Sequence, residues 1–388
     1  MRPSCRRSSR PTDRLTPTDT VAASPSAIQR LRLYYARHEG RVAALFFAGG
    51  FIFDTVAVGR VDSWHMIAQQ TVYLAIVTAV LTHMFFVPDA PALEGLPAVK
   101  RWYYRYRIAI LSFCLGTLLN MYTLFFFKSS SLLVSFAFMG VLVLLLLANE
   151  AKRLKFLGLS LKFALLGLCF LCFFAYAIPV FVGSIGLPVF LLSMAAGCLP
   201  LLAAGASVRI FAPELFPRVR AQIFVPLGLV VLGFLTFYLF RLVPPVPLSI
   251  PFIGVYHSVE RTEQGYRLAH ERSRWRWWHN GDQNFLAQPG DKVYVFFRVF
   301  SPTRFSDEVL MRWYRKDPAR GWTLQDSIPI KILGGREEGF RGYGVKASYQ
   351  PGDWKVQIET NDGREIGRIY FELESAPAAP RSFESELV

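Results

Sequence analysis

The sequence predicts a membrane protein in two parts: an all-α bundle of about seven transmembrane helices, then an all-β, immunoglobulin-like antiparallel sandwich. Three observations predict it. Of 388 residues, 53% are hydrophobic and only 18% are charged, whereas soluble proteins average about 25% charged. Long apolar runs approach the ~20 residues that a helix needs to cross a bilayer. After Phe252 the pattern changes to short alternating segments separated by turn residues, which is typical of strands.

The apolar runs define the helical part, residues 42–243. The predicted spans are 42–59, 64–87, 108–127, 131–148, 161–182, 185–205 and 223–243. The shortest requires tilt or local thinning of the bilayer. Before them, residues 1–41 are rich in Arg, Ser, Pro and Thr, so we expect a basic cytoplasmic tail that is largely disordered, and no cleavable signal.

The distribution of cations near the spans predicts their orientation. If the N-terminus is inside, the outer side holds only Arg60, Lys128 and Arg241. The inner side then holds Arg30, Arg32, Arg37, Arg41, Lys100, Arg101, Arg105, Arg107, Lys152, Arg153, Lys155, Arg209, Arg218 and Arg220. Loops rich in Lys and Arg stay in the cytoplasm. Seven spans then place the C-terminal domain across the membrane.

A polar cluster is predicted where the first two spans meet. Its members are Asp54, Arg60, Asp62, Gln69 and Gln70. At 1.5 Å per residue, Asp54 and the two glutamines lie at matching depths on neighbouring helices. A carboxylate at that depth needs hydrogen-bond donors, so the cluster is either a polar clasp that fixes the hairpin or a proton or ion site. Because Asp54 lies near an interface, we favour the clasp.

No pattern in the sequence indicates catalysis, a metal or a cofactor. The pair Cys169 and Cys172 has redox spacing, but its neighbours are apolar, which favours a packing role. The histidines show no metal-ligand spacing, and no catalytic motif occurs. The net charge of +15 belongs mainly to the membrane half, so it does not indicate nucleic acid as a partner. We therefore expect a protein that is not an enzyme and has no cofactor.

The outer part begins with a stiff proline-rich linker at 244–252. Residues 253–376 contain seven to nine candidate strands, separated by turns such as Pro351-Gly352-Asp353 and Asn361-Asp362-Gly363. This rhythm favours an antiparallel sandwich of immunoglobulin type. Residues 377–388 are predicted to be a flexible tail.

The stretch 272–280 is the candidate binding surface of this domain. Alternation along a strand sends its arginines to one face and two tryptophans to the other. One interpretation is a tryptophan core with a solvated arginine face. The other is a surface that binds a polyanion, a lipid headgroup or a glycan. The residues of that surface are Arg272, Arg274, Arg276, Trp278 and His279.

Two segments resemble a family of uncharacterised bacterial inner-membrane proteins that end in a small periplasmic β-rich domain of unknown function. The first is FDTVAVGRVDS at 53–63, similar to the family's first hairpin. The second is WYRKDPARGWTLQDSIPIKILGG at 313–335, followed by PGDWKV at 351–356. The family usually has an Arg/Trp-rich strand after the double glycine, whereas here the chain reads REEGFRGYGVKAS. The resemblance implies a multi-pass inner-membrane protein, with its N-terminus in the cytoplasm and its C-terminal domain in the periplasm, and no known activity.

Three functions fit these features. We favour a non-enzymatic membrane protein that presents its periplasmic sandwich to bind or scaffold an envelope glycan, lipid or protein. The alternative is a transporter or lipid-handling protein that uses the polar cluster around Asp54, with membrane lipids as its partners. A sensor would need a partner for its output, because the inner segments are too short to form an output domain.

Overall fold

A computed structural model describes residues 63–88, 94–129, 137–138, 140–144, 158–271, 278–302, 305–334 and 339–388. Within these ranges, five helical segments are long and apolar enough to cross a membrane. They are α2 (Trp64–Phe86), α3 (Ala98–Lys128), α5 (Leu159–Val182), α6 (Leu187–Phe211) and a continuous segment formed by η1 (Pro213–Leu215), α7 (Phe216–Val219), η2 (Arg220–Phe224) and α8 (Val225–Leu239).

Five of the seven predicted spans are thus confirmed as helices. The predicted span 42–59 lies outside the described residues, as do the polar residues Asp54, Arg60 and Asp62. The span 131–148 is described only at 137–138 and 140–144, which are helical.

Two helices extend beyond the apolar runs that predicted them. α3 begins at Ala98, ten residues before the run at 108, and it carries Arg107 into the interior. The guanidinium of Arg107 donates to the carbonyls of Val87 (3.1 Å) and Pro88 (2.9 Å), and thereby caps the end of α2. The last span begins at Pro213, ten residues before the run at 223, and contains one π-helical turn, η2, which ends two residues before Pro226. The missing N–H of Pro226 interrupts the α-helical ladder there.

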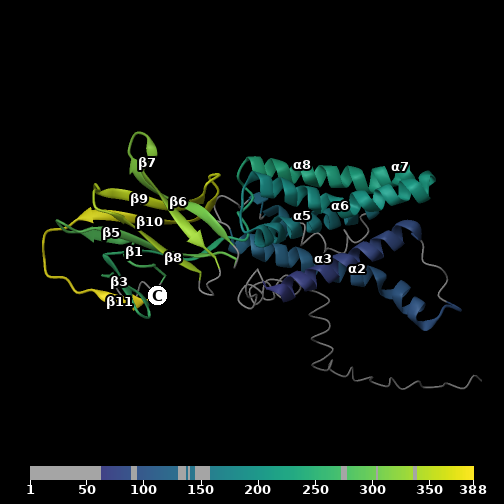
Figure 1. Ribbon diagram of the computed structural model, residues 1–388, viewed down its shortest axis with the longest axis horizontal. Coiled ribbons are helices and arrows are strands. Elements are labelled where there is room, and N and C mark those ends of the chain that lie inside the picture. The colour runs from purple at the N-terminus through teal and green to yellow at the C-terminus, as the bar shows by residue number, and fades with distance from the viewer. Residues whose placement is uncertain are drawn as a thin grey trace, which may run out of the picture. The chain divides into compact units, whose positions relative to one another are not determined.

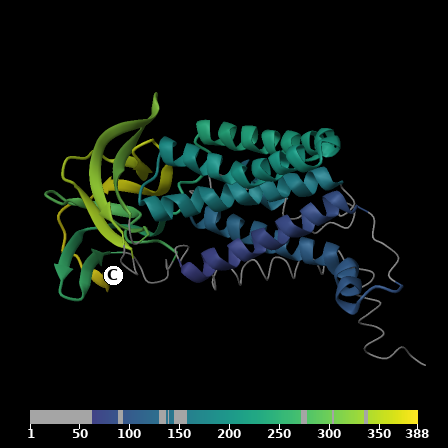
Figure 2. The same cartoon turned by 45° about the vertical axis from the view of Figure 1, so that its right-hand side comes forward.

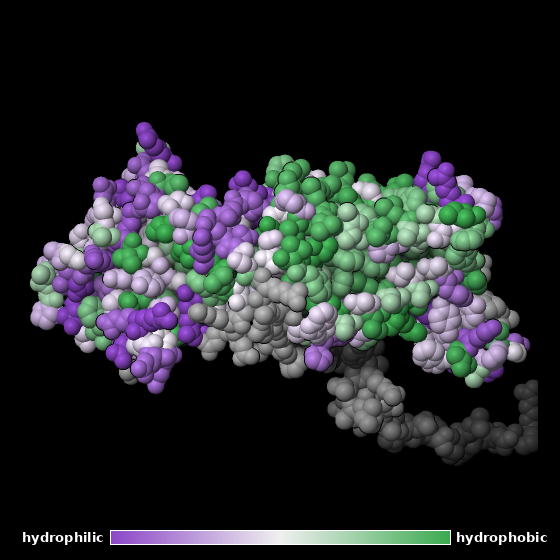
Figure 3. Space-filling view, in the orientation of Figure 1, coloured by the Kyte–Doolittle hydropathy of each residue, from purple (hydrophilic) through white to green (hydrophobic). Residues whose placement is uncertain are grey.

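The helices pack around α5, which lies beside α6 and α8 (Figure 1, Figure 2). Gly197 allows α6 to approach α5 closely, because a Cβ at Gly197 would come within 3.0 Å of the Leu171 Cα. The outer surface of these helices is a broad apolar area (Figure 3). Its exposed members include Leu191, Leu199, Leu202, Leu229 and Leu232. Such an area fits contact with lipid.

The C-terminal part is a β-sandwich-like domain of three sheets. The first sheet contains β1 (Ser249–Tyr256), β5 (Val293–Phe300) and β8 (Phe340–Lys346) in the order β1-β5-β8. The second contains β4 (Asn284–Ala287), β6 (Ser306–Asp317), β7 (Gly321–Leu333), β9 (Gly352–Thr360) and β10 (Glu365–Ser375) in the order β4-β10-β9-β6-β7. The third contains β2 (Ser258–Thr262), β3 (Gly265–His270) and β11 (Glu384–Leu387) in the order β11-β3-β2.

A continuous apolar core joins the first two sheets. It is centred on Phe297 of β5, Met311 and Trp313 of β6, and Val356 and Ile358 of β9, all of them fully buried. Alternate residues along these strands point into it, as the period of two requires. The core holds the domain together without a disulfide.

Three expectations about this domain need correction. The sheets are not wholly antiparallel, because β4 pairs with β10 in parallel. The predicted linker ends early, because β1 already begins at Ser249. The predicted flexible tail contains β11, which pairs with β3. The sequence of a short segment at a domain boundary does not predict whether it will pair with a strand elsewhere in the domain.

Polar contacts join the helices to this domain. The Ser306 N–H, at the start of β6, donates to the Gly183 carbonyl (3.1 Å) after α5. Arg364, in the turn between β9 and β10, donates to the carbonyls of Tyr238 and Val243, both at 3.1 Å. β6 and β10 therefore begin at the helices and run away from them.

Candidate functional site

The strongest candidate site is a groove on the five-stranded sheet, with a volume of about 420 Å³. We call it the aromatic groove. Its exposed rings are Trp322 of β7 and Tyr370 of β10, whose centroids lie 5.7 Å apart. His279 closes one side. The lining also includes Trp354 and Phe371 and four polar residues, namely Gln283, Asn284, Asp353 and Glu372. The volume is in the range of pockets that hold small ligands.

Strand register brings these residues together. Tyr370 lies opposite Lys355 on β9, and Lys355 lies opposite Tyr314 on β6. Residues that share a row in this way point to the same face of the sheet. The ammonium of Lys355 lies 5.2 Å from the Trp322 ring and 4.4 Å from the Tyr314 ring. Lys355 thus links the rings of β7 and β6 across the sheet face through cation–π contacts.

Charged side chains lie on the sheet beside the groove. Burial, reinforced by the charge of Arg368, lowers the pKa of Lys355. Burial raises the pKa of Glu359, although Arg312 opposes this by its ion pair at 3.1 Å. The mixed charges are partly buried and paired, so they hold the rings in place.

The groove lies at the end of the sheet that is remote from the helices. β10 begins next to Arg364, which contacts α8, and Tyr370 and Glu372 come at its sixth and eighth residues. At about 3.3 Å per residue, Glu372 lies roughly 20 Å farther along the strand. The arrow of β10 in Figure 1 points away from the helices. For helices that cross a membrane, this places the groove at the end of the β domain that is remote from the membrane surface.

This arrangement suits a ligand with both apolar faces and hydroxyl groups. The C–H groups on the face of a sugar ring pack against flat aromatic rings. Carboxylates accept hydrogen bonds from sugar hydroxyls, and amides both donate hydrogen bonds to them and accept from them. In the residues that the structure describes, the ionisable side chains of the lining are His279, Asp353, Tyr370 and Glu372.

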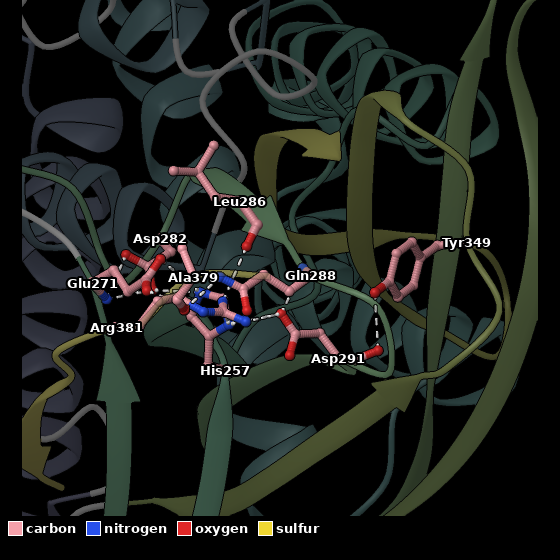
Figure 4. A network of polar contacts seen from close by, with 9 residues as sticks. All are labelled: His257, Glu271, Asp282, Leu286, Gln288, Asp291, Tyr349, Ala379 and Arg381. Carbon is pink, nitrogen blue, oxygen red and sulfur yellow. Dashed lines mark hydrogen bonds and ion pairs between the residues drawn. The ribbon is translucent and has the colours of Figure 1, made fainter. Parts of the chain in front are cut away.

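A second polar cluster surrounds His257, between β1 and β2 (Figure 4). Its Nε2 lies 3.5 Å from an Asp282 oxygen and 3.7 Å from a Glu271 oxygen. Its Nδ1 lies 3.5 Å from the Arg381 guanidinium, and Arg381 also donates to Asp291 (2.6 Å). Because arginine only donates, Nδ1 is the acceptor and the proton of neutral His257 is on Nε2.

The His257 cluster holds the C-terminal segment against the domain. Arg381 reaches it from the segment before β11 and also donates to the Leu286 carbonyl (3.2 Å). Burial, and then the charge of Arg381, lowers the pKa of His257 to about 4. Against burial, the Gln288 N–H and Arg381 hold the pKa of Asp291 below its usual range. Within the described ranges, no set of three His, Cys, Asp or Glu side chains is arranged to hold a metal ion.

The side chains of Gln69 and Gln70, the two described members of the predicted membrane cluster, lie in different environments. Gln70 is buried, and its side-chain oxygen accepts from the Tyr176 hydroxyl of α5 (2.8 Å). Gln69 is exposed and donates to Tyr73 on its own helix (3.3 Å). Adjacent helical residues lie about 100° apart, which explains the separation.

Of the predicted outer surface, Arg272, Arg274 and Arg276 lie outside the described residues. Trp278 is exposed, and its ring lies 5.9 Å from that of His279. His279 is the predicted residue that enters the aromatic groove. Trp322 and Tyr370 were not predicted. Alternation could have placed each on a strand face, but only the strand order brings β7, β9 and β10 together.

Solved structures offer distant likenesses. An immunoglobulin-like protein from Pseudomonas aeruginosa is 12% identical over 33% of this chain and 98% of its own, with a TM-score of 0.21. A β-glucosidase from Listeria innocua in complex with glucose is 11% identical with a TM-score of 0.19, over 24% of this chain and only 15% of that one. The Pseudomonas fluorescens alkylpurine DNA glycosylase AlkC bound to DNA is 11% identical over 82% of this chain and 99% of its own, with a TM-score of 0.21. TM-scores this low imply neither fold nor activity.

A family match is found in the β domain. No curated protein matches the chain. Residues 306–373 match the family described as protein of unknown function (DUF2914). The match runs from the start of β6 into β10 and contains Trp322, Asp353 and Tyr370 of the aromatic groove. The C-terminal β-rich region of this chain therefore contains a domain of unknown function, as the resemblance of residues 313–335 and 351–356 predicted.

Proposed function

We propose that this chain is a non-enzymatic integral protein of the bacterial inner membrane, and that its β domain binds a glycan of the cell envelope in the aromatic groove. The observation that carries the proposal is the pairing of Trp322 and Tyr370, more than a third exposed, with amide and carboxylate side chains around them. The distribution of Lys and Arg supports a periplasmic position for the domain.

The chemistry of the groove favours a glycan over a polyanion. A polyanion would need unpaired cations, whereas the described lining contributes the carboxylates Asp353 and Glu372 and no Lys or Arg. The Lys316 ammonium at the rim is already paired with Asp353 (3.1 Å). A neutral sugar loses no charge interaction when it binds here, and its ring covers exposed aromatic surface.

The experiment uses the full-length protein in detergent micelles and soluble peptidoglycan fragments as the probe. We expect saturable binding by isothermal titration calorimetry. Trp322→Ala and Tyr370→Ala should each weaken it at least fivefold, in line with the roughly 1–3 kcal/mol that a stacked aromatic contributes. Tyr343→Ala is the matched control, because Tyr343 is a similarly exposed tyrosine on β8 outside the groove.

Two results would overturn the proposal. One is the absence of binding to peptidoglycan fragments. The other is equal loss of binding in the Trp322→Ala and Tyr343→Ala variants, which would mean that the groove has no special role.

The transporter alternative receives less support from the described residues. It depends on Asp54, which lies outside them, and on a polar path near it. Gln70 is the buried glutamine of that cluster, and its oxygen is engaged by Tyr176 between two helices. An interhelical hydrogen bond of this kind favours packing.

A further inference from the structure

The helical part contains an apolar cavity of about 410 Å³ between α2, α5, α6 and η2. Its walls include Phe85 and Phe86 of α2, Phe163 of α5, Leu201 and Val208 of α6, and Ile223 of η2. The volume is that of a pocket for a small ligand, and the walls are those of a hydrocarbon site.

The polar residues in the wall do not change this character. The Thr78 hydroxyl donates to the Leu74 carbonyl (2.7 Å), and the Ser207 hydroxyl donates to the Ala203 carbonyl (2.9 Å). Two of the three hydroxyls in the wall are therefore used within their own helices, and the third belongs to Thr82. A ligand meets mainly methyl and aromatic groups, so a polar solute would lose its hydration without compensation.

Cations stand at the rim of this cavity. The guanidinium carbon of Arg218 lies 4.9 Å from the centroid of the Phe85 ring, which is part of the wall. Arg209 follows Val208 of the wall and lies 5.4 Å from the Phe216 ring. Lys162 directly precedes Phe163.

The cavity and its cations lie at one end of the bundle. α2 and α6 end there, while α5 and the last span begin there. Arg209, Arg218 and Arg220 all belong to this end, where the described acidic side chains are Glu94 and Glu214. The apolar cavity can hold an acyl chain, and the cations at its rim can contact a phosphate. An anionic phospholipid has both groups.

We propose that this cavity binds one acyl chain of an anionic phospholipid, whose phosphate contacts Arg218 and Arg209. The site is separate from the aromatic groove and does not depend on glycan binding. Arginine suits this role because its planar guanidinium can contact phosphate oxygens while it stacks on Phe85.

The test measures lipids retained by the full-length protein. The protein is delipidated in detergent, phosphatidylglycerol or phosphatidylcholine is added, and bound lipid is counted by native mass spectrometry. We expect one phosphatidylglycerol to bind at least fivefold more tightly than phosphatidylcholine, as about 1 kcal/mol per arginine at a membrane surface implies.

Three variants separate the parts of the site. Ala204→Phe places a ring in the cavity and should abolish retention of either lipid. Arg218→Gln should remove most of the preference for phosphatidylglycerol. Arg220→Gln is the control, because this exposed arginine is close in sequence but outside the wall, and it should behave as the parent.

The proposal fails if the parent protein retains both lipids equally, because the rim then selects no charge. It also fails if Ala204→Phe folds and still retains phosphatidylglycerol. If Ala204→Phe does not accumulate, Arg218→Gln decides alone: an unchanged preference in that variant refutes the site.

Discussion

The guanidinium carbon of Arg364 lies 3.5 Å from the centroid of the Tyr238 ring. Arg364 belongs to the turn between β9 and β10, and Tyr238 to the end of α8. The same arginine pairs with Asp362 (2.7 Å) and donates to the carbonyl of Tyr238 in α8 and to that of Val243 in the segment after it. It therefore binds one carbonyl in the last turn of α8 and attaches the β domain to the end of the last span.

Arg364→Ala should loosen this attachment. It removes a buried charge with several partners, leaves Asp362 without its ion-pair partner and takes one hydrogen bond from each of two carbonyls, at a cost of about 3 kcal/mol. We expect faster trypsin cleavage after Arg241, which lies beside Gly363 of the same turn. Arg368→Ala is the control, since Arg368 pairs with Glu365 inside its own sheet. Equal cleavage rates in the two variants would contradict the assignment.

His257 predicts a pH dependence of stability. Its pKa is lowered to about 4 by burial and then by Arg381, so the folded domain keeps it neutral while the unfolded chain protonates near pH 6.5. The unfolded state then binds the extra proton, and this group costs stability as the pH falls from about 6.5 to about 4, by up to about 3 kcal/mol. Below both values no further loss comes from His257.

The measurement is thermal unfolding of the full-length protein in detergent, followed by tryptophan fluorescence between pH 7.5 and 4. His257→Phe keeps a ring against Phe285, whose centroid lies 4.0 Å away, but cannot titrate. Its melting temperature should fall less steeply on acidification than that of the parent. Parallel curves would show that the carboxylates alone set the pH dependence.

The Gln70–Tyr176 hydrogen bond predicts coupling between α2 and α5. Gln70→Leu and Tyr176→Phe each leave a buried polar group unpaired, so each should lower the melting temperature. The double variant should lose less than the sum, with a coupling of about 0.6–1.7 kcal/mol as found for interhelical hydrogen bonds in membranes. Simple additivity would mean that this contact contributes nothing to packing.

Gly197 predicts a steric limit between α5 and α6. A Cβ there would lie 2.8 Å from the Leu171 side chain and 3.0 Å from its Cα, so Gly197→Val must push the helices apart. We expect a loss of about 1–3 kcal/mol, seen as a lower melting temperature in detergent. Gly233→Val is the matched control, because its Cβ would meet nothing within 4 Å. If both variants melt alike, close packing at Gly197 is not needed.

The sequence by itself determined the two-part organisation and the position of five helices, because runs of apolar side chains and their alternation are local properties of the chain. The helix ends were less predictable: α3 extends to Ala98 because Arg107 finds carbonyls at the end of another helix. The pairing of β11 with β3 depends on a strand more than a hundred residues away.

The candidate site shows the same division. Local sequence pointed to His279, which stands next to an arginine- and tryptophan-rich stretch. Trp322, Tyr370 and Asp353 meet His279 only because the strand order β4-β10-β9-β6-β7 brings distant segments together. Hydropathy and turn residues specify which segments become strands, whereas the partner of each strand is selected by burial of the whole core, which no local pattern contains.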